Sequence, residues 1–322
     1  MTDEINKYFL TQPATDENYT EEAYLDANPD IAKAVREGIS LSSGRQHFEI
    51  FGKEEKRCIR LPKSVIIEPK KKKLDKIRPL LRQDMNYIEK SGQHFNFLND
   101  DLVETFDIIS TDAISSNNYD RNVEELINRY KDGLILDCGS GRRDVYYENI
   151  VNFEIVDYDT TDVVGVGEKL PFIDNAFDAV ISLSVLEHVK DPFLCAKEIS
   201  RVLKPGGNLI CCVPFMQPFH GYPKHYYNMT HQGLINLFDG LLEFDKIEID
   251  EAALPIWSLT WILRNYANGL QGDARNEFLE LKIADLIETG DKYLDKAYVK
   301  ELSDEKNREL AYATVIFSHK AL

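Results

Sequence analysis

The sequence predicts an α/β protein built on a doubly wound sheet of about seven strands. From Gly133 onward, short apolar stretches alternate with amphipathic ones, which is typical of a sheet covered by helices on both faces. Residues 134–141, Leu-Ile-Leu-Asp-Cys-Gly-Ser-Gly, predict a buried strand followed by a glycine loop. With 322 residues, of which 43% are hydrophobic, the chain can supply the core of such a sheet and an additional module.

Charge and cysteine content narrow the classes of function. The net charge of -17 at pH 7 repels phosphate backbones, so a nucleic-acid partner is not expected. The five cysteines are odd in number and lack CxxC spacing, so neither a disulfide framework nor a zinc site is expected, and no metal-ligating residues stand out. No secretory signal is recognisable, and the longest apolar stretch, 252–263, is too short to span a membrane. We expect a soluble, cytoplasmic protein.

Residues 1–60 predict a small helical module. Apolar residues recur at helical spacing between about Glu21 and Arg57, and glycines punctuate them. The pattern Tyr-Leu followed by Asn-Pro-Asp-Ile in 24–31, and then His-Phe-Glu-Ile-Phe-Gly in 47–52, resembles a short module attached to polysaccharide-related enzymes. This resemblance implies a connection with glycans.

Residues 61–130 predict a basic linker and a helical extension that packs across the sheet. Four consecutive lysines occupy positions 70–73. Such a run usually forms a solvated linker or helix face, and a specific anion or membrane-surface site is the alternative. The helical pattern of the extension ends near Gly133.

Residues 131–254 predict the core of the sheet, 255–308 a helical insertion, and 309–322 the final strand. The clearest helix has Asp191 as its N-cap and Pro192 at its first position. We expect the insertion to act as a lid, as a contact in a homo-oligomer, or as a buttress on the sheet edge. The predicted strands are 134–136, 150–153, 163–164, 177–182, 208–213, 245–249 and 312–317.

The loop after the first strand predicts a ligand site. Gly139 and Gly141 permit positive φ and close approach of a ligand to backbone amides. A dinucleotide fingerprint fails, because Asp144 stands where the third glycine is required. Asp137 before the loop would repel a pyrophosphate and would suit a ligand that carries an ammonium group.

Four further motifs follow in order, and together with this loop they resemble the class I methyltransferases, in particular those with a methyltransferase-11 type domain. The resemblance runs from about Gly133 to Phe238. Its motifs are 136–141 (Leu-Asp-Cys-Gly-Ser-Gly), 168–172 (Glu-Lys-Leu-Pro-Phe), 174–178 (Asp-Asn-Ala-Phe-Asp), 186–189 (Leu-Glu-His-Val) and 201–207 (Arg-Val-Leu-Lys-Pro-Gly-Gly). The resemblance implies a Rossmann-like fold and S-adenosyl-L-methionine as the cofactor.

The same resemblance implies the cofactor-binding residues. The first loop would hold the methionyl end, and an acid after the second strand would bind the ribose hydroxyls, with Glu154 preferred and Asp157 as the alternative. Backbone groups of the third loop would meet adenine, because Val166 replaces the acid found there in many members. The full set is Asp137, Gly139, Ser140, Gly141, Glu154, Asp157, Gly167, Glu168, Leu170, Ser182, Leu183 and Ser184.

The segment after the fifth strand predicts the acceptor side. It is rich in histidine and aromatic residues, and loops at the carboxyl ends of parallel strands form the ligand crevice. Methyl transfer needs alignment and removal of one proton, and a histidine can serve as the base. His225 is the preferred base and His220 the second, unless both only hydrogen-bond the loop. For His188, a structural role in the core is favoured.

The leading hypothesis is therefore an S-adenosylmethionine-dependent methyltransferase that O-methylates a sugar, a glycan or another small molecule. The glycan preference depends on the N-terminal resemblance alone. One alternative is a non-catalytic module that binds S-adenosylmethionine. Another is an NAD-linked oxidoreductase, which the missing third glycine and the position of Asp137 disfavour.

Overall fold

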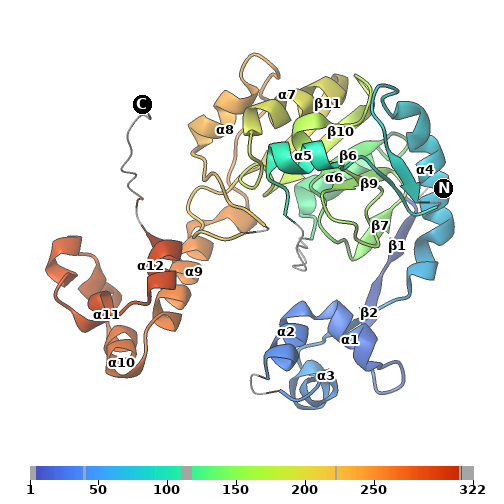
Figure 1. The fold of residues 1–322 in the computed structure, drawn as a ribbon. Coiled ribbons are helices and arrows are strands. Elements are labelled where there is room, and N and C mark those ends of the chain that lie inside the picture. Colours follow the sequence, from blue (N-terminus) through green and yellow to red (C-terminus); the bar gives the residue numbers. More distant parts are fainter. Residues whose placement is uncertain are drawn as a thin grey trace.

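The central feature of the computed structural model is a seven-stranded sheet in the order β11-β10-β6-β8-β9-β5-β4 (Figure 1). The structure describes residues 5–38, 41–90, 92–109, 118–221, 223–311 and 313. All neighbouring strands in this sheet are parallel except β4, which is antiparallel to β5. The strands are β4 Ile88–Lys90, β5 His94–Asn96, β6 Ile135–Cys138, β8 Ile150–Glu154, β9 Val163–Val164, β10 Phe177–Leu183 and β11 Leu203–Cys212.

The chain reverses its direction of travel across the sheet at β6. After β6 it moves outward through β8 and β9, and it then crosses back to β10 and β11 on the other side of β6. Asp137 of β6 is in register with Asn152 of β8 and with Ile181 of β10. The carboxyl ends of these three strands therefore meet at one topological switch point, where ligands bind in open α/β sheets. This arrangement confirms the predicted Rossmann-like α/β fold.

The outer strands differ from the prediction. Residues 245–249 form no strand, and Ile247 and Ile249 are 59% and 71% exposed because no described strand pairs with them. The predicted strand 312–317 lies outside the described residues, apart from Ala313. The two additional strands, β4 and β5, come instead from the segment before the core, where β5 pairs with β9.

Helices cover both faces of the sheet. The larger core layer contains side chains of α4 Ile67–Ile77, α7 Pro192–Val202 and α8 His231–Phe238. The opposite layer is formed by α6 Arg121–Arg129, whose buried residues Val123, Leu126 and Ile127 pack on the strands. Asp191 caps α7 as predicted, since its side chain accepts a hydrogen bond from the Leu194 amide. The short helix α5 Asp100–Phe106 follows β5.

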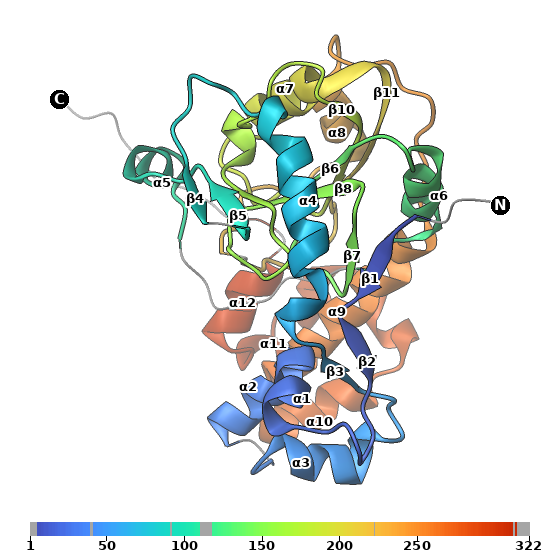
Figure 2. The ribbon, with the colours of Figure 1, turned by 90° about the vertical axis from the view of Figure 1, so that its right-hand side faces the viewer.

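The lysine run at 70–73 belongs to helix α4, which runs along the sheet in Figure 2. Lys71 and Lys72 are exposed, but Lys70 and Lys73 are buried. Lys73 Nζ donates to the Ile150 carbonyl oxygen at 2.5 Å and lies 2.8 Å from Asp162 Oδ2. Burial lowers the pKa of Lys73 to about 8 against the opposing charge of Asp162. The expected solvated helix face is present at Lys71 and Lys72, but the expectation is wrong for Lys70 and Lys73, which are buried and bind the carbonyl oxygens of Asp159 and Ile150.

The N-terminal residues form a small unit beside the sheet (Figure 1). Its core is a cluster of Tyr24, Ile31, Phe48 and Ile59. One small antiparallel sheet connects it to the rest, because β1 pairs with β7, and a second lies within the unit, where β2 pairs with β3. Its elements and β7 are β1 Lys7–Phe9, β2 Thr11–Pro13, α1 Glu21–Ala27, α2 Pro29–Glu37, α3 Gly44–His47, the π-helical turn Phe48–Gly52, β3 Cys58–Arg60 and β7 Val145–Tyr147.

The helices after residue 254 form a separate cluster that extends to one side of the sheet in Figure 1. These helices are α9 Pro255–Asn268, α10 Gly272–Glu280, α11 Ala297–Lys300 and α12 Asp304–Leu310. They share a core of Ala267, Leu270, Ala274, Phe278, Tyr298 and Leu302. Short 3-10 turns lie at Lys63–Ile66, Arg78–Leu80, Gly167–Lys169, Glu251–Ala253, Ile283–Leu286 and Gly290–Tyr293. Within the described ranges, every helix is too short or too polar to traverse a bilayer.

Candidate functional site

A cavity opens at the carboxyl ends of the central strands. Loops from both halves of the sheet contribute to its wall, as the switch point requires. Its wall includes Gly139 after β6, Glu154 at the end of β8, Gly167 and Glu168 after β9, and Ser184, Val185 and His188 after β10. Five of these seven residues belong to the predicted cofactor set.

Position 139 requires glycine, because of its backbone conformation and because of a close neighbouring side chain. Its φ is +86°, and a Cβ atom at this position would lie 2.4 Å from Cγ2 of Val185. Gly141 also has positive φ, +61°, and its amide donates to Glu154 Oε2 at 2.8 Å. Ser140 is buried, and its hydroxyl donates to the Gly141 carbonyl oxygen at 3.1 Å, so its side chain stabilises the loop. Of these three residues only Gly139 lines the cavity, where it presents bare backbone, and Ser140 and Gly141 lie outside the wall.

Asp137 lies beneath this loop and is absent from the cavity wall. Its Oδ2 atom accepts hydrogen bonds from Tyr119 Oη at 2.5 Å and from Arg143 Nη2 at 2.6 Å. Its Oδ1 atom is buried and lacks a hydrogen-bond partner among the described residues. The pairing with Arg143 was missed in the sequence, where the two arginines directly after Gly141 were the available signal. A direct contact with the methionyl group stays a prediction.

Glu154 and Asp157, the two candidates for the ribose, are separated by the structure. Glu154 lines the cavity, and its two oxygens accept the amides of Gly141 and Ile155, both at 2.8 Å. Burial raises the pKa of Glu154. Asp157 lies at the sheet edge, 2.6 Å from Lys90 Nζ and 3.0 Å from His94 Nδ1. Glu154 alone of the two is placed to meet a ligand.

The predicted adenine segment is only partly in the wall. A Cβ atom at Gly167 would lie 2.8 Å from Cys195 Sγ, so this loop packs tightly on α7. Glu168 is 4% exposed, and its Oε1 accepts the amides of Lys190 and Asp191 at 3.0 and 3.3 Å. Leu170 points into the core instead, and its amide donates to Glu198 Oε2 at 2.9 Å.

The wall after β10 begins one or two residues later than Ser182 and Leu183. Ser182 is fully buried and Leu183 packs on the layer of α6, while Ser184 lines the cavity as predicted. The wall also contains Asp107, which sequence reasoning missed, and Lys224 and Tyr226 of the segment that was predicted to face the acceptor. Asp107, Lys224 and Tyr226 lie together there: Lys224 Nζ is 2.9 Å from Asp107 Oδ2, and the Tyr226 hydroxyl donates to the same oxygen at 3.0 Å.

Three histidines gather where the loops after β10 and β11 meet, and of these three only His188 lines the cavity. The ring centroids of His220 and His225 are 4.3 Å apart, and those of His188 and His220 are 5.1 Å apart. His225 has both ring nitrogens engaged, since Nδ1 accepts the His220 amide at 3.1 Å and Nε2 donates to Asn228 Oδ1 at 3.0 Å. Among the described residues, His220 has a hydrogen-bond partner only at Nδ1, which donates to the Pro218 carbonyl oxygen at 2.9 Å. Of the two predicted bases, His220 therefore has the ring nitrogen available for a proton.

His188 is half-buried and lines the cavity, although a purely structural role was favoured. Its Nδ1 atom hydrogen-bonds the Lys224 carbonyl oxygen, and its Nε2 atom lies 3.7 Å from Glu187 Oε1. Burial and the two other histidines lower the pKa of His188 to about 4, so its ring is neutral at neutral pH. Glu187 is fully buried, and burial raises the pKa of its carboxyl to about 8.

Comparison with known proteins gives the class of this domain. A family model described as "Methyltransferase domain" matches residues 138–211, which include the glycine loop, most of the cavity wall and Glu187. An uncharacterized methyltransferase of Schizosaccharomyces pombe is 42% identical over 72 residues, 21% of this chain and 26% of that protein. Demethylmenaquinone methyltransferase of Staphylococcus haemolyticus is 36% identical over 88 residues, 27% of this chain and 36% of that protein. Residues 138–211 are thus similar to a methyltransferase domain, and the chain spans about a third or less of the length of these relatives.

Solved structures with some likeness include two methyltransferases. A SAM-dependent methyltransferase of Methanosarcina mazei is 16% identical with a TM-score of 0.32, and the match covers 43% of this chain and 93% of that one. The 1,6-didemethyltoxoflavin-N1-methyltransferase of Burkholderia thailandensis, solved with S-adenosylhomocysteine, is 16% identical with a TM-score of 0.30. That match covers 42% of this chain and 73% of the other.

Proposed function

We propose that this protein is an S-adenosylmethionine-dependent methyltransferase that O-methylates a sugar, a glycan or another small molecule. The observation that carries the proposal is the shared wall of one cavity, in which the bare backbone of Gly139 faces the same space as the Glu154 carboxylate. A Cβ atom at Gly139 would clash with Val185, which also lines the cavity, so only glycine lets the backbone and Val185 share this part of the wall.

S-adenosylmethionine fits the donors and acceptors of this cavity. Its ribose carries two hydroxyls, and each oxygen of Glu154 accepts one backbone amide and retains a lone pair for a further hydrogen bond. The bound cofactor would supply an activated methyl group on a cationic sulfonium. The protein's part is to align the acceptor and to exclude water from the cavity.

The acceptor would approach from the side of His188 and His220. An oxygen nucleophile must lose a proton, and the Nε2 atom of His220 has no hydrogen-bond partner among the described residues. His225 would instead hold the loop through the His220 amide and Asn228. The preference for a sugar or glycan still rests on the N-terminal pattern alone, and a nucleic-acid acceptor is disfavoured by the net charge of -17.

Calorimetry on two matched variants tests the proposal. We expect S-adenosylhomocysteine to bind the wild type and Asp157→Asn equally, because Asp157 lies outside the cavity. Glu154→Gln should weaken binding roughly tenfold or more, since a charged acceptor of two hydroxyl hydrogen bonds becomes a neutral one.

Binding of NAD in place of S-adenosylhomocysteine would contradict the proposal, as would wild-type affinity in Glu154→Gln. A screen of nucleotide sugars and glycans for incorporation of a labelled methyl group then tests the acceptor. Cofactor binding with no transfer to any hydroxyl-bearing acceptor would favour a non-catalytic binding module.

A further inference from the structure

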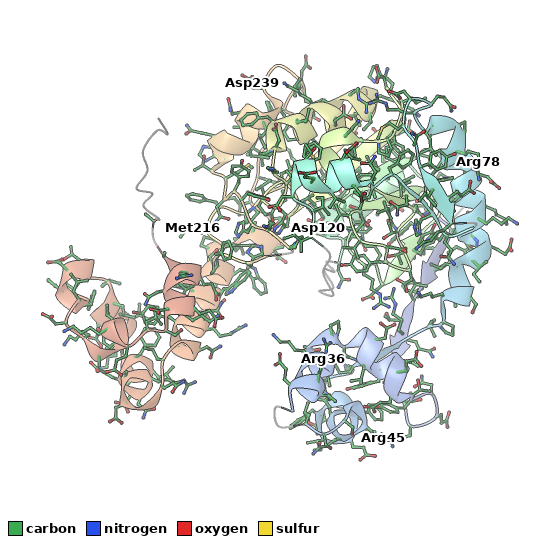
Figure 3. All side chains as sticks on the ribbon, viewed as in Figure 1. Arg36, Arg45, Arg78, Asp120, Met216 and Asp239 are labelled. Carbon is green, nitrogen blue, oxygen red and sulfur yellow. The ribbon has the colours of Figure 1, made fainter. Side chains whose placement is uncertain are left out.

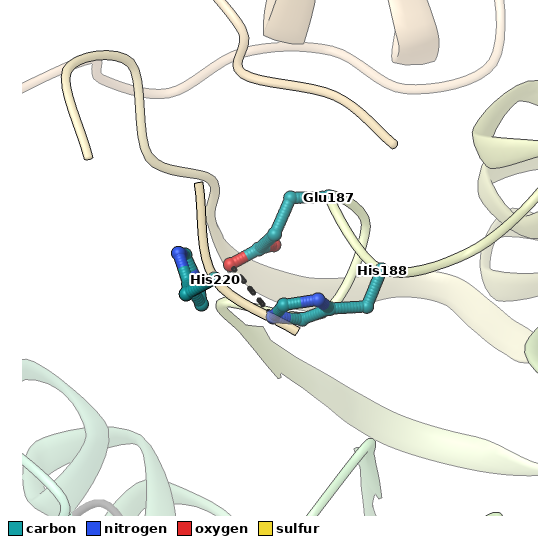
Figure 4. A group of neighbouring side chains, drawn as sticks. All are labelled: Glu187, His188 and His220. Atoms are coloured by element: carbon teal, nitrogen blue, oxygen red, sulfur yellow. Dashed lines mark ion pairs between the residues drawn. The ribbon is translucent and has the colours of Figure 1, made fainter. Parts of the chain in front are cut away.

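We infer that Glu187, His188 and His220 form a binding site for a divalent first-row transition-metal ion at the acceptor end of the cavity. One ligand atom from each residue lies within 4.8 Å of the other two. Figure 4 shows the carboxylate and the two imidazoles converging from separate loops. Glu187 and His188 follow β10, whereas His220 follows β11.

The first argument concerns the Glu187 carboxylate. Glu187 is 0% exposed, and neither of its oxygens has a hydrogen-bond partner among the described residues. A buried carboxylate without donors is costly, and buried charges are normally paired or coordinate metals. The nearest basic group is the Nε2 atom of His188 at 3.7 Å, which is too far for a hydrogen bond. A cation bound between these groups would supply the missing partner.

The second argument concerns the orientation of the imidazoles. His188 and His220 each direct Nδ1 toward a backbone carbonyl oxygen, of Lys224 and Pro218 respectively. A carbonyl oxygen accepts only, so Nδ1 carries a proton in both rings, and in the neutral tautomer Nε2 is the atom with the lone pair. Metal-bound histidines typically make this outer hydrogen bond, which fixes the tautomer and orients the ring. His225 lacks this arrangement, because both of its nitrogens are engaged.

The third argument concerns rigidity. The backbone carbonyl oxygen of Glu187 accepts the amides of Tyr226 and Tyr227 at 2.7 and 3.2 Å, which ties the loop after β10 to the loop after β11. The ligand-bearing loops are thus held together by backbone hydrogen bonds. Two imidazoles and one carboxylate favour manganese, iron, cobalt or zinc over magnesium or calcium, which prefer oxygen ligands.

The position of the site suggests its ligand. Three protein ligands leave coordination positions open, and His188 lines the cavity that the cofactor would occupy. An acceptor with a hydroxyl, or with two adjacent oxygens, could occupy those positions, where the cation would orient the oxygen and lower its pKa. With a metal bound, the Nε2 atom of His220 is a ligand and no longer a base, so the cation takes over the activation of the acceptor oxygen. This role for the metal rests on the proposed methyltransferase function, whereas the metal site itself does not.

Titration of the chelator-treated full-length protein with Co²⁺ tests the site. We expect one cobalt ion per chain, with visible absorption bands of a coordinated ion, and much weaker binding of Mg²⁺ in calorimetry. Glu187→Gln and His220→Gln should each lower Co²⁺ affinity at least roughly tenfold. His231→Gln is the matched control, because His231 is exposed at the start of α8 and lies outside the cluster, so it should bind as the wild type does.

Two further measurements separate the outcomes. S-adenosylhomocysteine binding and the thermal midpoint of each metal-free variant report whether the cavity and the fold are intact. The inference is overturned if the wild type binds no Co²⁺, as expected for a protonated buried acid, or if the Glu187→Gln/His220→Gln double variant binds Co²⁺ normally. Co²⁺ binding without S-adenosylhomocysteine binding would support the metal site and contradict the proposed function. S-adenosylhomocysteine binding without Co²⁺ binding would support the proposed function and contradict the metal site.

Discussion

Gly139 illustrates how a single backbone position shapes the cavity. Alanine there would need a left-handed φ and would place its Cβ 2.4 Å from Val185. We expect Gly139→Ala to weaken S-adenosylhomocysteine binding by roughly tenfold or more. Backbone strain or displacement of the loop that costs about 1.4 kcal/mol of binding free energy already lowers the affinity tenfold. Calorimetry measures the change.

Gly233 provides the control for this prediction. It lies in α8, and an added Cβ would meet only ordinary contacts at 3.6 Å. Gly233→Ala should leave cofactor affinity unchanged and raise helix stability by about 0.5–1 kcal/mol. If Gly139→Ala binds as tightly as Gly233→Ala, the loop does not approach the ligand closely.

Residues that act through their own backbone or strand position were predictable from the sequence. Gly139 and Glu154 belong to this class, since a glycine loop and an acid after a buried strand are local patterns. Asp137 shows the limit, because its carboxylate is occupied by Arg143 and Tyr119, which no local pattern indicates. The sequence likewise could not show that Glu187 lacks a hydrogen-bond partner among the described residues, because this depends on which groups the fold places around it.

At the scale of elements, Asp159 connects the N-terminal unit to the glycine loop. Its carboxylate lies 3.0 Å from Arg60 Nη2 of β3 and 3.3 Å from Arg142 Nε, which follows Gly141. Arg142 also lies 2.6 Å from Asp26 in α1. Burial alone would raise the pKa of Asp159, but the two arginines overcome it and hold the pKa below its ordinary value.

This pairing predicts a pH-dependent stability. A carboxyl with a depressed folded pKa stabilises the fold above its unfolded pKa, and the contribution is lost as the pH falls through the folded value. We expect Asp159→Asn to lower the free energy of unfolding by about 3 kcal/mol near neutral pH. The substitution removes the negative charge that Arg60 and Arg142, both buried, share at this position. The difference from wild type should shrink below about pH 4.

Urea unfolding of both proteins at several pH values measures this difference. Asp30→Asn is the control, because Asp30 pairs with Arg57 at 2.9 Å but is 57% exposed, and such pairs contribute about 1 kcal/mol at most. A pH-independent difference for Asp159→Asn would show that the carboxylate charge is not what holds the two parts together.

Elements with a buried periodic pattern were predictable within a few residues. The strands at 150–153, 163–164 and 177–182 and the capped helix after Asp191 were all found. The three-residue strands β4 and β5 were missed, because three residues carry too little alternation to be distinguished from a loop. The burial of Lys70 and Lys73 could not be predicted from the lysine run. Their partners, the carbonyl groups of Asp159 and Ile150 and the carboxylate of Asp162, come near them only in the folded protein.

At the scale of the whole molecule, the helices after residue 254 have a hydrophobic core of their own. Phe278 stacks on Tyr266 with ring centroids 4.7 Å apart and is 9% exposed. We expect Phe278→Ala to destabilise this cluster by about 3–4 kcal/mol while leaving S-adenosylhomocysteine affinity unchanged. Hydrogen exchange should show lost protection in 255–310 and normal protection in the sheet.

Leu279→Ala is the matched control, since the neighbouring side chain is 54% exposed and its loss should change protection little. Loss of protection throughout β6, β8 and β10 in Phe278→Ala would instead show one cooperative unit. The roles considered for this segment, a lid, an oligomer contact or a buttress, stay predictions.

Arg142 touches both the N-terminal unit, through Asp26, and the loop after Gly141, through Asp159. If a ligand bound in the cavity shifts Arg142 toward Asp26 or toward Asp159, the interaction energy of Arg142 with the other carboxylate changes as well. Thermodynamic reciprocity then requires that whatever engages the N-terminal unit changes affinity for the cofactor by the same factor as the cofactor changes affinity for it. In that case the ion pairs of Arg142 would couple occupancy of the cavity to the N-terminal unit.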